Sequence, residues 1–266
     1  MRVTLSFNFT KDLSDLTHGE MLMEIMRSYG LVPTNAGDCQ PIRESFEASD
    51  LPKYWKLLKS PGGETAKFYF LFRGKKEINF TGMVTCNTGL HTNTRTFNGA
   101  TLWLNVRKTY DINKLVSLGD DLFIWSEANY GYITEEQKNI YNVFIQRKKY
   151  QESIFSVCDG IPGLMWLNYF GKPYLAEKGF RLPDGQVPVG HGARVRLSER
   201  PDDEVLGDLD YIKKHQEIIG SQWFCPIKKI ENGVGYLPDT FIRSDIISPV
   251  FDRSEMIRKR DRPEDC

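Results

Sequence analysis

The 266-residue sequence predicts an α+β fold with a mixed or antiparallel sheet and packed helices. Segments with the two-residue period of strands and segments with the period of helices both occur, without the regular alternation of a doubly wound sheet. Hydrophobic residues make up 40% and charged residues 26%, as in ordinary globular proteins. We therefore expect one domain at 1–251, with potential pseudo-related halves at 1–150 and 151–251, and a charged, solvated tail at 252–266.

The chain opens with a predicted strand and helix. Apolar and polar residues alternate over 3–9, which is the pattern of a half-buried strand. Thr17 and Glu20 have the spacing of a capping box, and the apolar face that follows predicts a helix that ends at Gly30.

Short strands dominate the next hundred residues. The patterns predict a short helix at 50–58, strands at 67–73, 78–84 and 101–106, and a polar hairpin loop or sheet edge at 87–99. The stretch 67–73 (KFYFLFR) is apolar throughout, which favours a strand covered on both faces.

Two helices are predicted in the middle of the chain. Asp111 is placed to cap the first, with a potential break near Gly119. Thr134 and Gln137 have capping-box spacing and predict the second.

A strand at 193–197 and a helix at 201–220 close the pattern. Their order, followed by an aromatic pair, repeats over 193–224 the order seen at 101–125. This weak repetition is the reason for considering two halves.

The charge balance and the cysteines limit the class of protein. The 35 Lys and Arg residues equal the 35 Asp and Glu residues, whereas nucleic-acid binders usually carry a basic excess, so we expect no nucleic-acid partner. The alternating N-terminus predicts a strand and not a signal peptide, and no apolar run reaches the ~18 residues of a membrane helix. Five scattered cysteines without a CxxC pair predict reduced thiols and a cytoplasmic protein.

Motifs of catalysis and metal binding are scarce. Phosphate loops, nucleophile elbows and HExxH motifs do not occur in the sequence. Cys86, His91 and His191 suggest a metal site, but such solitary residues are more typical of a buried thiol and exposed imidazoles. Cys158 could be a nucleophile, although free cysteine is more often buried. The GHG element at 190–192 favours a turn into a strand over a flexible catalytic loop. We expect no catalytic residues, no metal and no cofactor.

The stretch 160–174 predicts a buried strand that turns sharply into a short helix. It contains turn-forming and aromatic residues in a distinctive order: Gly160, Pro162, Gly163, Trp166, Asn168, Phe170, Gly171, Pro173 and Tyr174. This motif resembles a family of bacterial immunity proteins, and the likeness covers roughly residues 100–224. Its flanking matches are Ala128, Tyr130, Gly131, Gly220, Trp223 and Phe224.

The resemblance implies an immunity protein that is encoded beside a polymorphic toxin and neutralises it by binding in the cytoplasm. Related immunity proteins often protect against type VI secretion effectors, including restriction-endonuclease-like nucleases. The motif is interpreted as scaffold, with Trp166 and Phe170 in the core and Asn168 bonded to the backbone. The alternatives are a hydrolase with a spatially assembled site, using Cys158 or a carboxylate pair, and a general scaffold or regulatory module.

A nuclease toxin would have a basic substrate cleft, which a neutral inhibitor could match with a local acidic patch. The densest acidic cluster is Asp202, Asp203, Glu204, Asp208 and Asp210. Acids at the start of a helix also cap free N–H groups and favour the helix dipole, so a purely structural role is the competing interpretation. The polar loop at 87–99 is the next candidate.

Overall fold

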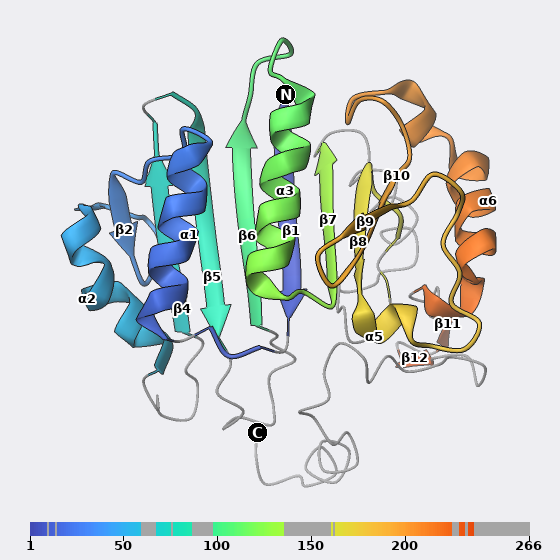
Figure 1. Ribbon diagram of the computed structural model, residues 1–266, viewed down its shortest axis with the longest axis horizontal. Helices are drawn as coiled ribbons and strands as arrows, with labels where there is room; N and C mark the ends of the chain where they lie inside the picture. Colours follow the sequence, from blue (N-terminus) through green and yellow to red (C-terminus); the bar gives the residue numbers. More distant parts are fainter. Residues whose placement is uncertain are drawn as a thin grey trace, which may run out of the picture.

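The computed structural model describes residues 1–9, 11–13, 15–59, 68–75, 77–86, 98–135, 161, 163–224, 229–231 and 234–236. These residues form a ten-stranded sheet with helices packed on it (Figure 1), which confirms the predicted α+β class. All pairings within this described sheet are antiparallel. The predicted tail at 252–266, Cys158 and all but the last two residues of the loop at 87–99 lie outside the described residues.

The spatial order of the strands mixes early and late parts of the chain. In order they are β3 (Glu44–Ser45), β2 (Asn35–Gly37), β4 (Phe68–Gly74), β5 (Asn79–Cys86), β6 (Asn98–Asn105), β1 (Arg2–Phe9), β7 (Tyr130–Glu135), β8 (Leu167–Gly171), β10 (Gly192–Arg196) and β9 (Val187–Val189). Strands β11 (Lys229–Glu231) and β12 (Val234–Tyr236) pair separately. Because β7 pairs with β8, strands from both sides of residue 150 share one sheet.

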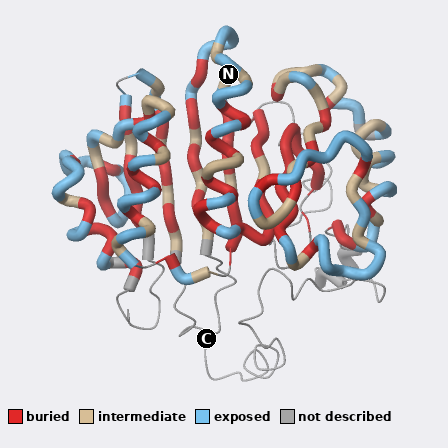
Figure 2. The backbone as a smooth tube through the Cα atoms, in the orientation of Figure 1, coloured by how far each residue is buried: buried red, intermediate tan, exposed pale blue. Residues whose placement is uncertain are grey.

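The helices are short apart from three. The α-helices are α1 (Leu16–Ser28), α2 (Leu51–Trp55), α3 (Ile112–Ser126), α5 (Lys172–Leu175) and α6 (Leu209–Ile219), and the 3-10 helices are η1 (Ala48–Asp50), η2 (Lys56–Lys59), η5 (Glu204–Gly207) and η6 (Ser221–Trp223). Helices α1 and α3 lie on the same face of the sheet (Figure 1), and the residues between them and the strands are buried (Figure 2). None of the helices in the described ranges is long and apolar enough to cross a membrane.

Helix α1 begins two residues earlier than its sequence pattern predicted. The Asp15 carboxylate, not the Thr17 hydroxyl, caps the helix and accepts the Thr17 backbone N–H at 3.0 Å. The Thr17 hydroxyl also donates to Asp15, at 2.8 Å, so it supports the cap instead of forming it. Gly30 ends the helix as expected, with a positive φ of 75° that glycine adopts without strain.

Helix α3 is continuous through Gly119, so the predicted break is wrong. Asp111 caps the helix as predicted, accepting the Asn113 N–H at 2.9 Å. A Cβ on Gly119 would overlap the hydroxyl of buried Tyr169 on β8. The glycine therefore permits close packing of helix on sheet, and does not interrupt the helix.

Two other predicted helix starts differ from the structure. Thr134 is fully buried in β7, where it pairs with Thr4, and the helix predicted after it lies outside the described residues. The helix predicted at 201–220 is divided into η5 and α6, and Asp208 caps the second part.

The two faces of the sheet differ in composition. Towards the helices, the central strands bury apolar residues such as Phe7, Phe80 and Leu102. On the opposite side, which we call the far face, the alternate residues of β5, β6 and β1 are mostly half-buried Thr, Ser, Met and Trp. At β7 and β8 the far face is instead covered by aromatic residues that include Tyr174 and Trp223.

Candidate functional site

The described residues of the motif at 160–174 are buried, apart from exposed Lys172 and half-buried Pro173. Trp166 is fully buried, and its Nε1–H donates to the Ser198 carbonyl at 2.9 Å. Asn168, also fully buried, bonds the backbone of Met165 twice: its Oδ1 accepts the N–H at 2.9 Å and its Nδ2 donates to the carbonyl at 2.8 Å. These contacts satisfy the buried amide within the fold, so its polar atoms have internal partners.

Aromatic packing fixes the second half of the motif. Phe170 on β8 lies 6.0 Å from the ring of Tyr174 on α5, and both rings contact Phe180. Gly171 cannot carry a side chain, because a Cβ there would overlap the Ala128 carbonyl. Pro173 lies in the first turn of α5, where its missing N–H costs nothing. Gly163 has a φ of 149°, and Gly160 and Pro162 lie outside the described residues. The described aromatic and amide side chains of the motif are therefore engaged within the fold.

The acidic cluster at 202–210 is divided into two local arrangements. In the first, the Asp202 carboxylate accepts from Arg200 Nε at 3.0 Å and Asp203 accepts the Arg200 backbone N–H at 2.8 Å. In the second, Asp208 caps α6 by accepting the N–H groups of Asp210 and Tyr211 at 2.9 and 3.3 Å.

Two of the five predicted acids, Asp203 and Asp208, thus bond backbone N–H groups as the competing interpretation expects, and Asp202 forms an ion pair with Arg200. Glu204 and Asp210 are exposed, and their carboxylates make none of these local bonds. A partner could reach both.

Of the residues considered for a metal site, the structure describes the side chain of His191. His191 stacks on Phe123 at 4.4 Å, and its Nε2 lies 2.9 Å from the Ala128 carbonyl. Cys86 ends β5, and His91 lies outside the described residues. Over the described ranges, no three His, Cys, Asp or Glu side chains approach closely enough to hold a metal ion. The GHG element is the turn between β9 and β10, as predicted.

A polar network that the sequence did not predict connects α1, α3, β8 and β10. Arg194 on β10 forms an ion pair with Asp120 on α3, and the two side chains are 13% and 25% exposed. Next to it, burial and then the Asp120 carboxylate raise the pKa of the Tyr169 phenol far above its usual value. On the other side of α3, Tyr29 donates to Asp121 at 2.6 Å, and burial together with this carboxylate raises the Tyr29 pKa.

Adjacent Asp120 and Asp121 do not form the carboxylate pair that a hydrolase would need. Neighbouring positions on a helix point in different directions, and these two carboxylates bind partners on opposite sides of α3. The network joins helices to the sheet, and its residues hold one another instead of a reacting group.

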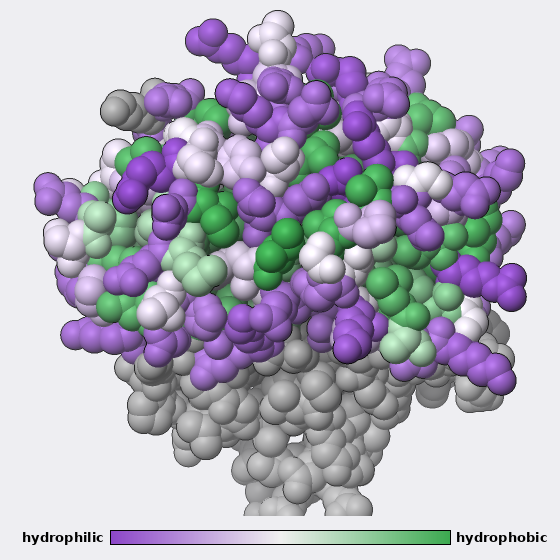
Figure 3. All heavy atoms as spheres, viewed as in Figure 1, coloured by the Kyte–Doolittle hydropathy of each residue, from purple (hydrophilic) through white to green (hydrophobic). Residues whose placement is uncertain are grey.

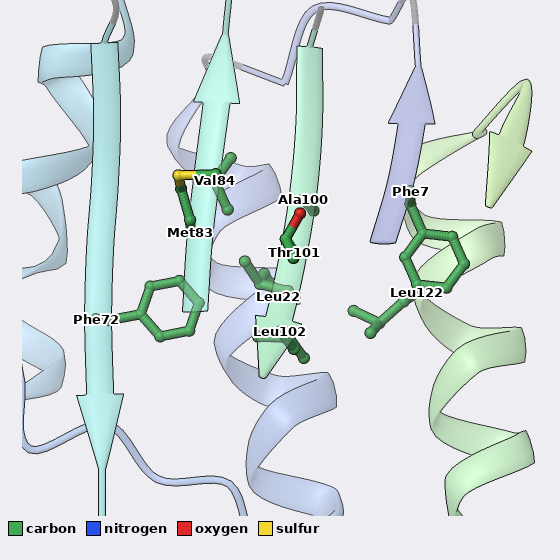
Figure 4. A pocket seen from close by; sticks show the side chains of 9 residues that line it. All are labelled: Phe7, Leu22, Phe72, Met83, Val84, Ala100, Thr101, Leu102 and Leu122. Atoms are coloured by element: carbon green, nitrogen blue, oxygen red, sulfur yellow. The ribbon is translucent and has the colours of Figure 1, made fainter. Parts of the chain in front are cut away.

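A small cavity lies between the helices and the sheet (Figure 4). Its volume is about 10 Å³, and its lining includes Phe7, Leu22, Phe72 and Leu122. This is the lower limit for one water molecule, which would also need several polar partners. The cavity cannot hold a substrate.

Comparison with known proteins gives a fold relationship. No family model matches the chain, and no curated protein matches it. Among solved structures, a Pseudomonas aeruginosa T6SS protein, PA0821, superposes with a TM-score of 0.50 at 14% sequence identity. The match covers 98% of this chain and 84% of that one. At this level of identity, the likeness establishes a shared fold.

Proposed function

We propose that the chain is a cytoplasmic immunity protein, which binds a cognate secreted bacterial toxin and neutralises it stoichiometrically. The observation that carries the proposal is the fold likeness over 98% of the chain to a T6SS protein. It agrees with the immunity-family resemblance of the motif around Trp166 and Phe170. Both are needed, because a fold by itself does not define a function.

The geometry of the described residues supports binding over catalysis. The perturbed groups Tyr169 and Tyr29 are engaged with aspartates on α3, and the cavity beside α3 is too small for a ligand. We therefore propose that the protein has no enzymatic activity, and that it acts through an interface of roughly 800 Å² on each partner. A nuclease is the proposed class of toxin, and the acidic cluster, of which Glu204 and Asp210 are exposed, is the alternative contact surface that charge reversal tests.

Co-expression tests the proposal. The gene adjacent to this one is expressed in a bacterial host with and without the present chain, and growth and DNA integrity are measured. We expect intoxication without the chain, protection with it, and a 1:1 complex on size-exclusion chromatography. A noncognate immunity protein serves as the control.

The opposite result would support the hydrolase alternative. If the purified chain turned over a nucleic acid, peptide or ester, and Cys158→Ala or His191→Ala abolished the turnover, the proposal would be wrong. If the chain bound the toxin without protecting cells, it would be a scaffold or a regulator.

A further inference from the structure

The far face of the sheet carries a contiguous patch that the proposed function has not used. We define the far-face patch as Thr81 and Met83 on β5, Thr101 and Trp103 on β6, and Ser6 on β1, all half-buried. Register brings them together: Thr81 pairs with Trp103, and Thr101 pairs with both Met83 and Ser6. The hydroxyls of Ser6 and Thr101 lie 3.3 Å apart. Figure 4 looks onto this side, with the helices behind the strands, and shows Met83 and Thr101 on neighbouring strands.

The composition of the patch differs from that of an ordinary solvated sheet. Threonine and serine are common on the wet face of a strand, but Lys and Glu normally accompany them to keep the surface soluble. Here the five positions carry no charge, while Trp103 and Met83 lie among the hydroxyls. Charge depletion with enrichment in Trp and Met is the composition of the centre of a protein interface. On the helix side, hydrophobic residues are scattered among hydrophilic ones (Figure 3). Met21 on α1 and Ile124 on α3 are exposed hydrophobic residues.

The edge of the patch indicates the chemistry of its partner. Arg73 on β4 pairs with Thr81 and therefore lies beside the patch, on the same face. Its side chain is half-buried, and no carboxylate of the described residues forms an ion pair with its guanidinium. No Asp or Glu occupies a far-face position of the described sheet strands, so a carboxylate from another molecule would be the natural acceptor.

We infer that the far-face patch is the centre of the interface with the toxin. The occupant is a protein surface that is uncharged where it covers Trp103 and Thr101 and presents a carboxylate to Arg73. This inference rests on the proposed function, because it takes the toxin as the partner. A toxin surface that presents a carboxylate differs from a basic cleft that binds phosphates. The chain would therefore bind a nuclease toxin outside its substrate cleft.

Calorimetric titration against a catalytically inactive form of the adjacent gene's product tests the assignment. Thr101→Glu places a negative charge at the centre of the patch and should weaken binding at least 100-fold. Trp103→Ala should weaken it at least 30-fold, the loss typical of a hot spot. Arg73→Ala should weaken it about 10-fold and reduce its salt dependence. Met21→Glu is the matched control on the helix side and should leave affinity unchanged.

Thermal melting of each variant separates lost binding from lost folding. Thr101 and Met21 are both partly exposed, so both glutamate variants should melt close to wild type. If the toxin binds Thr101→Glu as tightly as wild type, the assignment is wrong while the proposed function stands. If wild type does not bind the toxin, both are wrong. A dimer that Thr101→Glu dissociates, or an oligonucleotide bound through Trp103, would replace the toxin as occupant and overturn the inference.

Discussion

Replacing Trp166 with alanine should unfold the protein at a lower temperature without affecting the toxin-binding surface. The side chain is completely buried, and removing a buried Trp costs about 3–5 kcal/mol through lost burial and the cavity that remains. The Ser198 carbonyl also loses the 2.9 Å hydrogen bond from Nε1, which adds about 1 kcal/mol. Since 1 kcal/mol shifts Tm by roughly 2–4 °C in a protein of this size, we expect a decrease of about 10–20 °C.

Differential scanning calorimetry measures the decrease, and titration with the inactive toxin below the lower Tm measures binding. Trp166→Phe is the matched control, because it keeps an aromatic ring and loses mainly the hydrogen bond; its cost should be about 1–2 kcal/mol. If Trp166→Ala melted within a few degrees of wild type and yet failed to bind the toxin, Trp166 would be an interface residue. The scaffold interpretation of the motif would then be refuted.

Three further predictions concern charged and titratable groups. Asp208→Ala removes the cap of α6 and should cost about 1 kcal/mol in chemical denaturation, whereas Asp208→Asn should cost much less; equal losses would show that the cap bond is unimportant. The double substitution Asp203→Lys and Glu204→Lys should lower stability modestly and leave the rate of association with the toxin unchanged in stopped-flow measurements. Slower association with a flatter salt dependence would instead show that the acidic cluster steers the toxin. Because the Tyr29 pKa is raised above its ordinary value of 10.0, the stability it contributes is present below pH 10 and is lost as the pH rises further. Tm should therefore fall less between pH 9 and 11 in Tyr29→Phe than in wild type. An equal decrease of Tm with pH in the two proteins would contradict this.

Sequence patterns predicted the elements whose causes are local. The alternation at 3–9, the cap at Asp111 and the strand-to-helix turn after Phe170 all depend on neighbouring residues, and each corresponds to an observed element. Thr134, predicted to cap a helix, instead belongs to a strand that pairs with β1, which is more than 120 residues away in the chain. Local capping preference was weaker than that long-range pairing.

The candidate surfaces were harder to predict for the same reason. Asp203 and Asp208 accept backbone N–H groups two or three positions away, which is the local pattern that a sequence can show. The Arg194–Asp120 pair spans 74 positions, and the far-face patch exists only because β5, β6 and β1 are adjacent. The alternation of apolar and polar residues shows that one face of a strand is exposed to solvent, but it does not identify the neighbouring strands.

The ends of the sheet limit how any partner can approach. One edge strand, β3, has two residues, and the other, β9, has three with Pro188 at its centre, where there is no backbone N–H to donate. Short and proline-containing edges resist the addition of a strand from another chain. The ten-stranded sheet can therefore accumulate in a cell without polymerising through its edges, and recognition by strand addition is disfavoured at both ends.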